Sequence, residues 1–336
     1  MAVNIRDNLK NGSLWNEFAT ILNAAIFDAD TQKNNYEELL KGLANVEKSN
    51  RWAEKITDFG GLGSFAYKEE GKDAKEDSFE EGYSKTLEHI SFSKTVIISR
   101  ELRDDNRVRE AKQKCMNMVA AWKRTKAEYL SQMLTTSIGA TTTMAFGGKT
   151  GIDITAPDGK ALFAADHLMK SVTGGTQCNL FKDELGSDPR ILNKISNALR
   201  NMKDDRGVAM GYTADTLIVP GNRPELERFA KAIIGSDGEV GSNKNDINTE
   251  RGKWKLIVNP LWTPASGNPY IVMSSEALKE LRGTNFFNRT ELDIEDDEEV
   301  KNRNLIYNGF GRFSAGFANY RHVCMGGSSD TTAKTL

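Results

Sequence analysis

Hydrophobic residues recur every three or four positions in five stretches of the chain, which is the spacing of an amphipathic helix. In the first stretch Leu14, Phe18 and Leu22 lie four residues apart, with Asn and Glu on the opposite side. One side of such a helix is apolar, so it needs another surface to cover it. The five predicted helical stretches are residues 13–27, 34–46, 99–134, 187–207 and 223–236.

The third stretch predicts the longest helix. Its apolar positions step by threes and fours from Val108 to Met133, apart from one gap at Thr125, and Arg, Lys, Glu and Gln fill the positions between. Asp104 or Asp105 marks the start, because an acid is favoured at the positive end of the helix dipole. About thirty residues at ~1.5 Å each give a rod of roughly 45 Å.

Residues 58–99 change from a helical period to alternation. Apolar residues alternate with others at both ends, as at Phe65 and Tyr67, and residues 68–81 between them are charged and poor in apolar side chains. This pattern predicts a long β-hairpin with a solvated tip. Two strands alone cannot bury both of their faces, so we expect a neighbouring subunit to hold the hairpin.

The second half of the chain predicts a mixture of helices and strands. The segment "DTLIVP", residues 215–220, indicates a buried strand, and residues 254–262 and 268–275 are predicted to pair with each other across a Pro/Gly loop. Alternation returns in residues 305–325. The order of helix, hairpin, long helix and mixed elements, with no internal repeat, predicts an α+β fold.

Composition and charge narrow the function classes. The 336 residues are 38% hydrophobic and 27% charged with a net charge of −2, which is ordinary for a globular protein and argues against a surface built to grip nucleic acid. No segment approaches the roughly 18 apolar residues of a membrane span, and "LWNEFATILNAAIF" lacks a signal cleavage site, so we expect a cytosolic, soluble chain. Cys115, Cys178 and Cys324 are odd in number and far apart, so neither disulfides nor a zinc cluster is expected.

The segment "DGKALFAADH" ends in Asp166 and His167, a pair that could serve a hydrolase or a metal enzyme. Either site needs further partners, and the other two histidines, His89 and His322, lie in the predicted hairpin and in the last predicted strand. We favour a polar strand end packed against a turn, and we keep a hydrolase or metal enzyme using Asp166 and His167 as the alternative.

Two further segments match binding motifs only in part. "FGGKT", residues 146–150, ends like a phosphate-binding loop, but Thr143 stands where the motif needs glycine and no helix follows. "DIEDDEEV", residues 293–300, lacks the glycine and the ligand spacing of a calcium loop, so we expect a solvated charge run. We therefore expect no cofactor, no metal and no enzymatic activity.

The order and spacing of several segments resemble a known family. "FGGLGSFAYKEEGKDAKEDSFEEGYSKTLEHISFSKTVIISRELRDDN" is similar to an extended loop that returns into a long helix, "DGKALFAADH" to a "DG..LF...H" segment, and "FGRFSAGFANYRHV" to closing strands. Residues 192–236 match a helix, turn, strand and helix in the same order. From about Gly60 to Val323, the chain resembles the tailed-phage major capsid proteins of the Hong Kong 97-type fold, and among them the Mu-like major head subunit family.

The resemblance implies an α+β, Hong Kong 97-type capsid fold with an N-terminal arm, a long β-hairpin called the E-loop, a peripheral (P) domain with a long spine helix, and a mixed α/β axial (A) domain. The implied parts are residues 1–57 for the arm and the entry to the P-domain, 58–99 for the E-loop, 100–140 for the spine helix, 141–187 for the hairpin and loop region between the P- and A-domains, 188–295 for the A-domain, 296–325 for the closing P-domain strands, and 326–336 for a flexible tail.

The resemblance also implies self-assembly into pentamers and hexamers of an icosahedral shell that encloses phage double-stranded DNA without sequence-specific contacts. The subunit would assemble in the cytoplasm of the bacterial host and reside in the virion capsid, with a portal and decoration proteins as further partners and no membrane. The implied E-loop begins near residue 58, which leaves no room for the scaffolding segment of many relatives. Either the chain is a mature form or a separate scaffolding protein assists it. An encapsulin-like compartment, which encloses a cargo enzyme instead of DNA, is the alternative.

We expect the contacts between subunits to come from apolar side chains of the arm and the hairpin. They are Leu14, Phe18, Leu22, Phe65, Tyr67, Phe79 and Tyr83. Packing within one chain is the alternative for these side chains. The hairpin lysines Lys68, Lys72 and Lys75 have no assignable acceptor, so no covalent cross-link is predicted.

Overall fold

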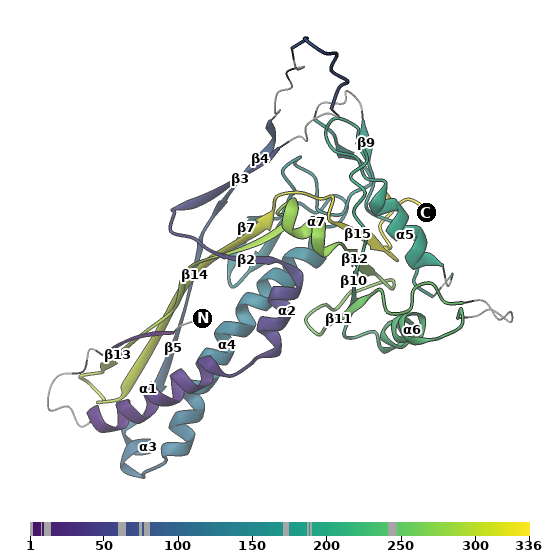
Figure 1. The fold of residues 1–336 in the computed structure, drawn as a ribbon. Coiled ribbons are helices and arrows are strands. Elements are labelled where there is room, and N and C mark those ends of the chain that lie inside the picture. The colour runs from purple at the N-terminus through teal and green to yellow at the C-terminus, as the bar shows by residue number, and fades with distance from the viewer. Residues whose placement is uncertain are drawn as a thin grey trace. The chain divides into compact units, whose positions relative to one another are not determined.

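The chain folds into two compact units, each assembled from separated segments (Figure 1). The computed structural model describes residues 3–7, 9, 15–59, 65–73, 76, 81–170, 175–186, 188, 190–240 and 247–336. The first unit comprises Met1–Glu54, Leu87–Leu130 and Phe286–Ala315, and the second comprises Lys55–Thr86, Ser131–Asn285 and Gly316–Leu336.

The first unit is built on a five-stranded sheet. Its strands run in the order β1 (Asn4–Asp7), β13 (Thr284–Glu298), β14 (Leu305–Phe317) and β5 (Ile90–Ile98), and β2 (Asn45–Lys48) also pairs with β13. β1 is parallel to β13, and β5 is antiparallel to β14. The last two strands therefore join segments that are about two hundred residues apart in the sequence.

Four helices belong wholly or largely to this unit. They are α1 (Asn16–Thr31), α2 (Asn35–Leu43), α3 (Arg100–Asp104) and α4 (Val108–Thr136). The first two confirm the first two predicted helical stretches, and the last two divide the third stretch, whose long helix begins at Val108 and not at Asp104 or Asp105. The Tyr307 hydroxyl of β14 donates to the side-chain oxygen of Asn23 of α1 at 3.1 Å, and Phe313 of β14 packs on Trp122 of α4. Tyr307 and Phe313 are an even number of residues apart, so α1 and α4 pack on the same face of the strand.

Aromatic rings form the centre of the core of the first unit. The ring of Phe313 is fully buried, and its centroid lies 4.8 Å from that of Phe92, 5.0 Å from Phe286, 5.2 Å from Tyr129 and 5.6 Å from Trp122. These rings come from three strands and from α4. Phe313 therefore connects the sheet to the long helix.

Two lysines of α4, Lys123 and Lys126, are buried. Lys123 donates to the backbone carbonyl of Asp30 at 2.7 Å and lies 3.3 Å from a carboxylate oxygen of Glu37. Lys126 lies 3.1 Å from a carboxylate oxygen of Glu291. Segments distant in sequence cover this side of α4, and their oxygens satisfy the two ammonium groups.

The second unit contains a four-stranded sheet in the order β11 (Lys255–Asn259), β10 (Thr216–Pro220), β12 (Tyr270–Met273) and β15 (Val323–Gly326). The prediction that β11 and β12 pair with each other is wrong, because β10 lies between them, parallel to β11 and antiparallel to β12. Every residue of β10 is buried, as expected for a central strand.

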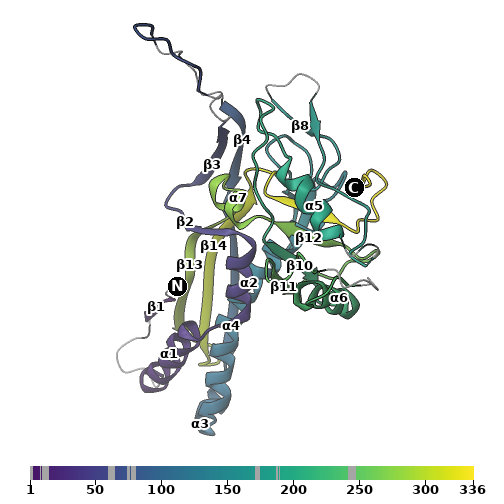
Figure 2. The same cartoon turned by 45° about the vertical axis from the view of Figure 1, so that its right-hand side comes forward.

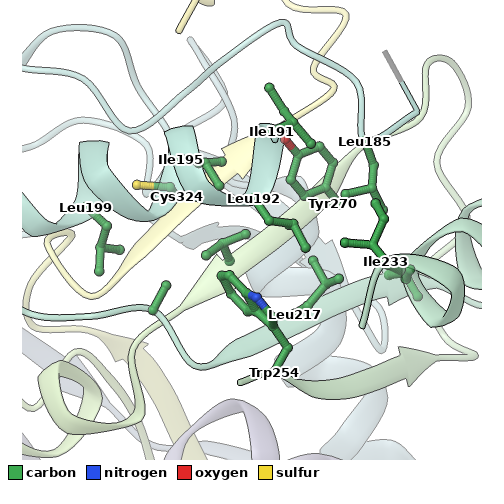
Figure 3. Packing of buried hydrophobic residues seen from close by; sticks show 14 of the residues in the cluster. Leu185, Ile191, Leu192, Ile195, Leu199, Leu217, Ile233, Trp254, Tyr270 and Cys324 are labelled. Atoms are coloured by element: carbon green, nitrogen blue, oxygen red, sulfur yellow. The ribbon is translucent and has the colours of Figure 1, made fainter. Parts of the chain in front are cut away.

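Helices α5 (Ile191–Arg200) and α6 (Pro224–Gly235) cover one face of this sheet and confirm the last two predicted helical stretches. Leu192 of α5, Leu217 of β10 and Tyr270 of β12 belong to one buried cluster (Figure 3). α5 ends well before Gly207, where its end was expected. A short helix, α7 (Ser275–Glu280), follows β12.

The second unit also contains small strand pairs. They are β3 (Ala53–Phe59) with β4 (Glu81–Glu88), β6 (Thr143–Phe146) with β7 (Lys149–Asp153), and β8 (His167–Leu168) with β9 (Thr176–Gln177). We call β3, β4 and the described residues 65–73 between them the hairpin (Figure 2). It is shorter than the hairpin predicted over residues 58–99, because β5 pairs with β14 instead of continuing it.

Most of the acidic residues 293–300 belong to β13, and every acid among them except Asp296 is at least partly exposed, as expected for a solvated charge run. Ile294 and Asp296 are fully buried, whereas Asp293 and Glu295 pair with Arg6 of β1. Strand alternation thus sends one half of the run into the unit and the other half outward. The expectation was wrong only for Asp296, which strand alternation places inside the unit.

Candidate functional site

The Asp166–His167 pair is not a catalytic pair, because the two side chains have different partners. Asp166 is exposed and lies 2.6 Å from the Lys160 ammonium. The His167 ring is fully buried, with Nδ1 2.7 Å from a carboxylate oxygen of Asp158 and Nε2 3.1 Å from the backbone carbonyl of Leu162. Both ring nitrogens already have partners, so neither is open to a substrate or a metal.

The surroundings of His167 give it a packing role. Its ring stacks on Tyr320 with centroids 3.8 Å apart and planes 2° apart. Burial alone would raise the pKa of Asp158, but the hydrogen bond and the charge of His167 hold that pKa below its usual range. The interpretation of a polar strand end packed against a turn is therefore confirmed for His167, because its partner Asp158 lies in the turn before β8.

The other two histidines have separate partners. His89 Nε2 lies 3.1 Å from the Ser49 hydroxyl, and His322 Nε2 lies 2.8 Å from the Thr284 hydroxyl. Among the described residues, no group of three or more His, Cys, Asp or Glu side chains is placed to hold a metal ion. No helix of the described chain is both long enough and apolar enough to span a membrane.

The segment "FGGKT" is the tight turn between β6 and β7, which pair antiparallel. Gly147 and Gly148 have φ angles of 57° and 88°, which suits a two-residue hairpin turn. The next element is a strand, so the turn lacks the helix N-terminus that binds phosphate. The interpretation of this segment as an ordinary loop is confirmed.

The predicted contact residues divide into an exposed and a buried group. Phe65 is fully exposed and Tyr67 is 91% exposed, while Tyr83 is half-buried with the Lys170 ammonium 5.8 Å from its ring centroid. Phe18 and Leu22 are buried within the first unit. Leu14 and Phe79 lie outside the described residues. For Phe18 and Leu22 the alternative, packing within one chain, therefore holds.

The base of the hairpin is held by charged side chains, which we call the hairpin anchor: Asp58, Lys85, Lys170, Asp205 and Arg321. Arg321 is almost completely buried, with one guanidinium nitrogen 3.2 Å from Asp58 on β3 and another 2.5 Å from Asp205. Lys170 donates to the backbone carbonyls of Glu81 and Gly82 on β4 at 2.6 and 2.8 Å. Both strands of the hairpin therefore have a cationic partner in the body of the second unit.

Lys85 supplies a third fastening on β4. Its ammonium donates to the backbone carbonyl of Thr155 at 2.5 Å and lies 3.1 Å from a carboxylate oxygen of Asp153. Burial lowers the pKa of Lys85, and the charge of Asp153 opposes that change. The anchor has no signal in the sequence, since its members are scattered from residue 58 to residue 321 and carry no common motif.

A profile of the phage capsid protein family matches residues 84–325, well over half of the chain. The chain belongs to the phage capsid protein family. Because this is a structural family, the capsid protein is a component of the virion, a subunit of the icosahedral shell and not an enzyme. None of the curated protein sequences matches it.

Solved structures show the fold of the capsid protein. It is similar to a chain from Mycobacterium phage Patience, with 11% identity, a TM-score of 0.53 and coverage of 100% of this chain and 95% of that chain. The capsid of Myoviridae phage XM1 matches at 11% identity and a TM-score of 0.51, covering 89% and 94% of the two chains. The capsid of an empty GTA particle matches at 10% identity and a TM-score of 0.50, covering 89% and 92%. The α+β fold is therefore of the Hong Kong 97 type.

Proposed function

We propose that the capsid protein is the major head subunit of a tailed phage of the Mu-like group, and that its copies join as pentamers and hexamers. In this proposal residues 1–57 are the arm and the entry to the P-domain, 58–88 the E-loop, 100–140 the spine helix, 141–187 the intervening loops, 188–285 the A-domain, 286–325 the closing strands and 326–336 the tail. The E-loop and the A-domain are shorter than the resemblance implies, because β5 and most of β13 belong to the sheet of the first unit. The order of the elements and the likeness of fold support this assignment. Ring closure into fives and sixes requires heterologous contacts between subunits.

The proposal rests on the hairpin. The hairpin anchor holds its base, and its tip, residues 65–73, exposes two aromatic side chains. Phe65 and Tyr67 are exposed at a place where no described residue of their own chain covers them. Burying an aromatic side chain contributes about 1.5–3 kcal/mol, so leaving both in water is unfavourable for an isolated subunit. A second copy of the chain supplies the missing cover when subunits assemble.

The buried positions of Phe18 and Leu22 change the proposed contacts of α1. Its exposed apolar side chains are Ile21 and Phe27, which we propose as contacts in place of the two buried residues. Each contact is small, but a subunit held at several sites at once dissociates slowly.

We further propose that a separate scaffolding protein, a portal and decoration proteins complete the particle. The double-stranded DNA inside would be held without sequence-specific contacts. The near-neutral charge of the chain supports this part of the proposal, because strong electrostatic binding to phosphates requires a basic surface.

The test replaces the aromatic tip and measures assembly. The double variant Phe65→Ser and Tyr67→Ser should remain a folded, soluble subunit, because neither side chain packs in the core. Its yield of closed shells, counted by electron microscopy after co-expression with a scaffolding protein, should fall by at least about ten-fold, because several contacts per subunit are lost together.

The matched control is the double variant Lys68→Ser and Glu70→Ser, which changes two exposed residues of the same segment without changing the net charge. This control should assemble like the wild type. Shells of normal number and size from the Phe65 and Tyr67 variant would refute the contact role of the hairpin tip.

A further inference from the structure

Asp205 contacts both Arg321 and Lys170, the residues that bind the two strands of the hairpin. Its side chain is buried, 3% exposed, in the turn between α5 and β10. One of its carboxylate oxygens accepts from the Arg321 guanidinium at 2.5 Å, and the same oxygen lies 3.4 Å from the backbone nitrogen of Lys170. Arg321 also binds Asp58 of β3, and the Lys170 ammonium binds backbone carbonyls of β4. One carboxylate therefore connects the rest of the second unit to both strands.

The connection to β3 is directional. The two terminal guanidinium nitrogens of Arg321 point to different carboxylates, Asp58 on the hairpin and Asp205 in the body. Asn319 donates to the same Asp58 oxygen at 2.9 Å. A planar guanidinium holds two acceptors in a fixed geometry that a single flexible ammonium does not reproduce. Because Arg321 is buried, salt screens these interactions only weakly.

The two strands are coupled where they meet the anchor. A Cβ at Gly82 of β4 would lie 2.9 Å from the carbonyl oxygen of Asp58, so the backbones are in close contact at this point. Lys170 binds the carbonyls of Glu81 and Gly82 on the β4 side of this contact. A rotation of either strand would therefore disturb the partner of the other.

We propose that Asp205, acting through Arg321 and Lys170, is a positioning residue that fixes the direction in which the hairpin leaves the second unit before assembly. A hairpin with a set direction loses less conformational freedom when its tip docks on a second copy. This inference rests on the proposed role of the hairpin tip in assembly. It adds that Asp205, through Arg321 and Lys170, sets the direction of the hairpin that carries this tip.

The first measurement is made on the unassembled subunit. Spin labels at Lys68→Cys in the hairpin and Glu225→Cys in α6, both exposed positions of the second unit, report the hairpin direction as a distance distribution from electron paramagnetic resonance. Cys178, the one partly exposed cysteine, is replaced by serine. Asp58→Asn, which removes the charge that pairs β3 with Arg321, should make the distribution about twice as wide, because local opening then becomes accessible.

Two further variants distinguish a change in hairpin direction from a general loss of folding. Arg321→Lys keeps the charge but loses the two-pronged geometry, so it should broaden the distribution as well. Asp73→Asn removes an exposed acid from the hairpin tip and should leave the width unchanged. Circular dichroism should show the same melting temperature for Asp73→Asn and the wild type, and a folded subunit for Asp58→Asn.

The outcomes separate this inference from the proposed function. Broad distributions together with a lower shell yield for Asp58→Asn support it, and an unchanged distribution in both Asp58→Asn and Arg321→Lys overturns it. A broad distribution with a normal shell yield would overturn the link between hairpin direction and assembly. Normal shells from the Phe65 and Tyr67 variant would refute the contact role of the tip, whatever the width measured in single subunits.

Discussion

The buried ring of His322 makes the stability of the subunit depend on pH in a way that one substitution should reveal. Burial lowers the pKa of His322 from its ordinary value of 6.5 to about 3. The ring is enclosed so closely that a Cβ at Gly283 would lie 2.3 Å from it. The folded protein therefore keeps this histidine neutral at pH values where the unfolded chain binds a proton.

The sign follows from which state binds the proton. Between pH 6.5 and pH 3 the unfolded state gains a proton that the folded state does not, so the free energy of unfolding falls as the pH falls through this window. From pH 7 to pH 5 the expected loss from His322 alone is about 2 kcal/mol. Above about pH 7.5 the ring is neutral in both states, so His322 no longer makes the free energy of unfolding depend on pH.

The assay is urea unfolding of the unassembled subunit at pH 7, 6 and 5, followed by tryptophan fluorescence. His322→Gln retains a side chain able to hydrogen-bond to Thr284 but cannot titrate, so its free energy of unfolding should fall by about 2 kcal/mol less than that of the wild type across this range. Any fall in the free energy of unfolding that remains in the variant comes from other groups. One of them is His89, whose pKa is lowered by burial and by the charge of Arg312. Equal losses in the wild type and in His322→Gln would refute the reasoning.

Two further substitutions test the core of the first unit. Phe313→Ala should lower the free energy of unfolding by about 3–5 kcal/mol in the same urea assay, because it leaves a cavity among four rings. The control, Phe310→Ala on the same strand, should change it by less than about 1 kcal/mol. Equal effects of the two substitutions would contradict the assigned core. Lys123→Met should cost about 3 kcal/mol, because it leaves the carboxylate of Glu37 without its buried partner, while Lys112→Met on the same helix should cost little. A neutral Lys123→Met would show that α1 and α2 do not depend on this contact.

The helices could be predicted from the sequence because their signal is local. The apolar spacing of the five stretches predicted α1, α2, α4, α5 and α6. The same pattern could not show that Lys123 and Lys126 are buried, since their partners lie up to 165 residues away. A periodic pattern identifies the apolar face of a helix, but other segments decide how far the buried region extends around it.

Strand order was harder to predict for a related reason. Residues 254–262 and 268–275 are neighbours in sequence, and neighbouring strands usually pair, but the wholly buried β10 inserts between them. The continuous apolar run of "DTLIVP" was the signal for a central strand, because a strand covered on both sides has no polar alternation.

The functional residues also divide into those that the local sequence reveals and those that depend on distant segments. The exposed aromatics Phe65 and Tyr67 could be found from the sequence, because apolar side chains in a polar segment indicate a partner. The hairpin anchor could not, since Arg321 and Asp205 are 116 residues apart and neither belongs to a recognisable motif. Asp166 and His167 drew attention by adjacency, but adjacent residues of an extended segment point in opposite directions.

The most direct test of the account is to image the purified full-length protein by negative-stain electron microscopy, with light scattering on the same sample, alone and with crowding agents and a co-expressed scaffolding protein. A self-assembling capsid subunit should form rings of five and six, tubes or closed shells under at least one of these conditions. A protein that stays monomeric under all of them would contradict its assignment as a self-assembling capsid subunit.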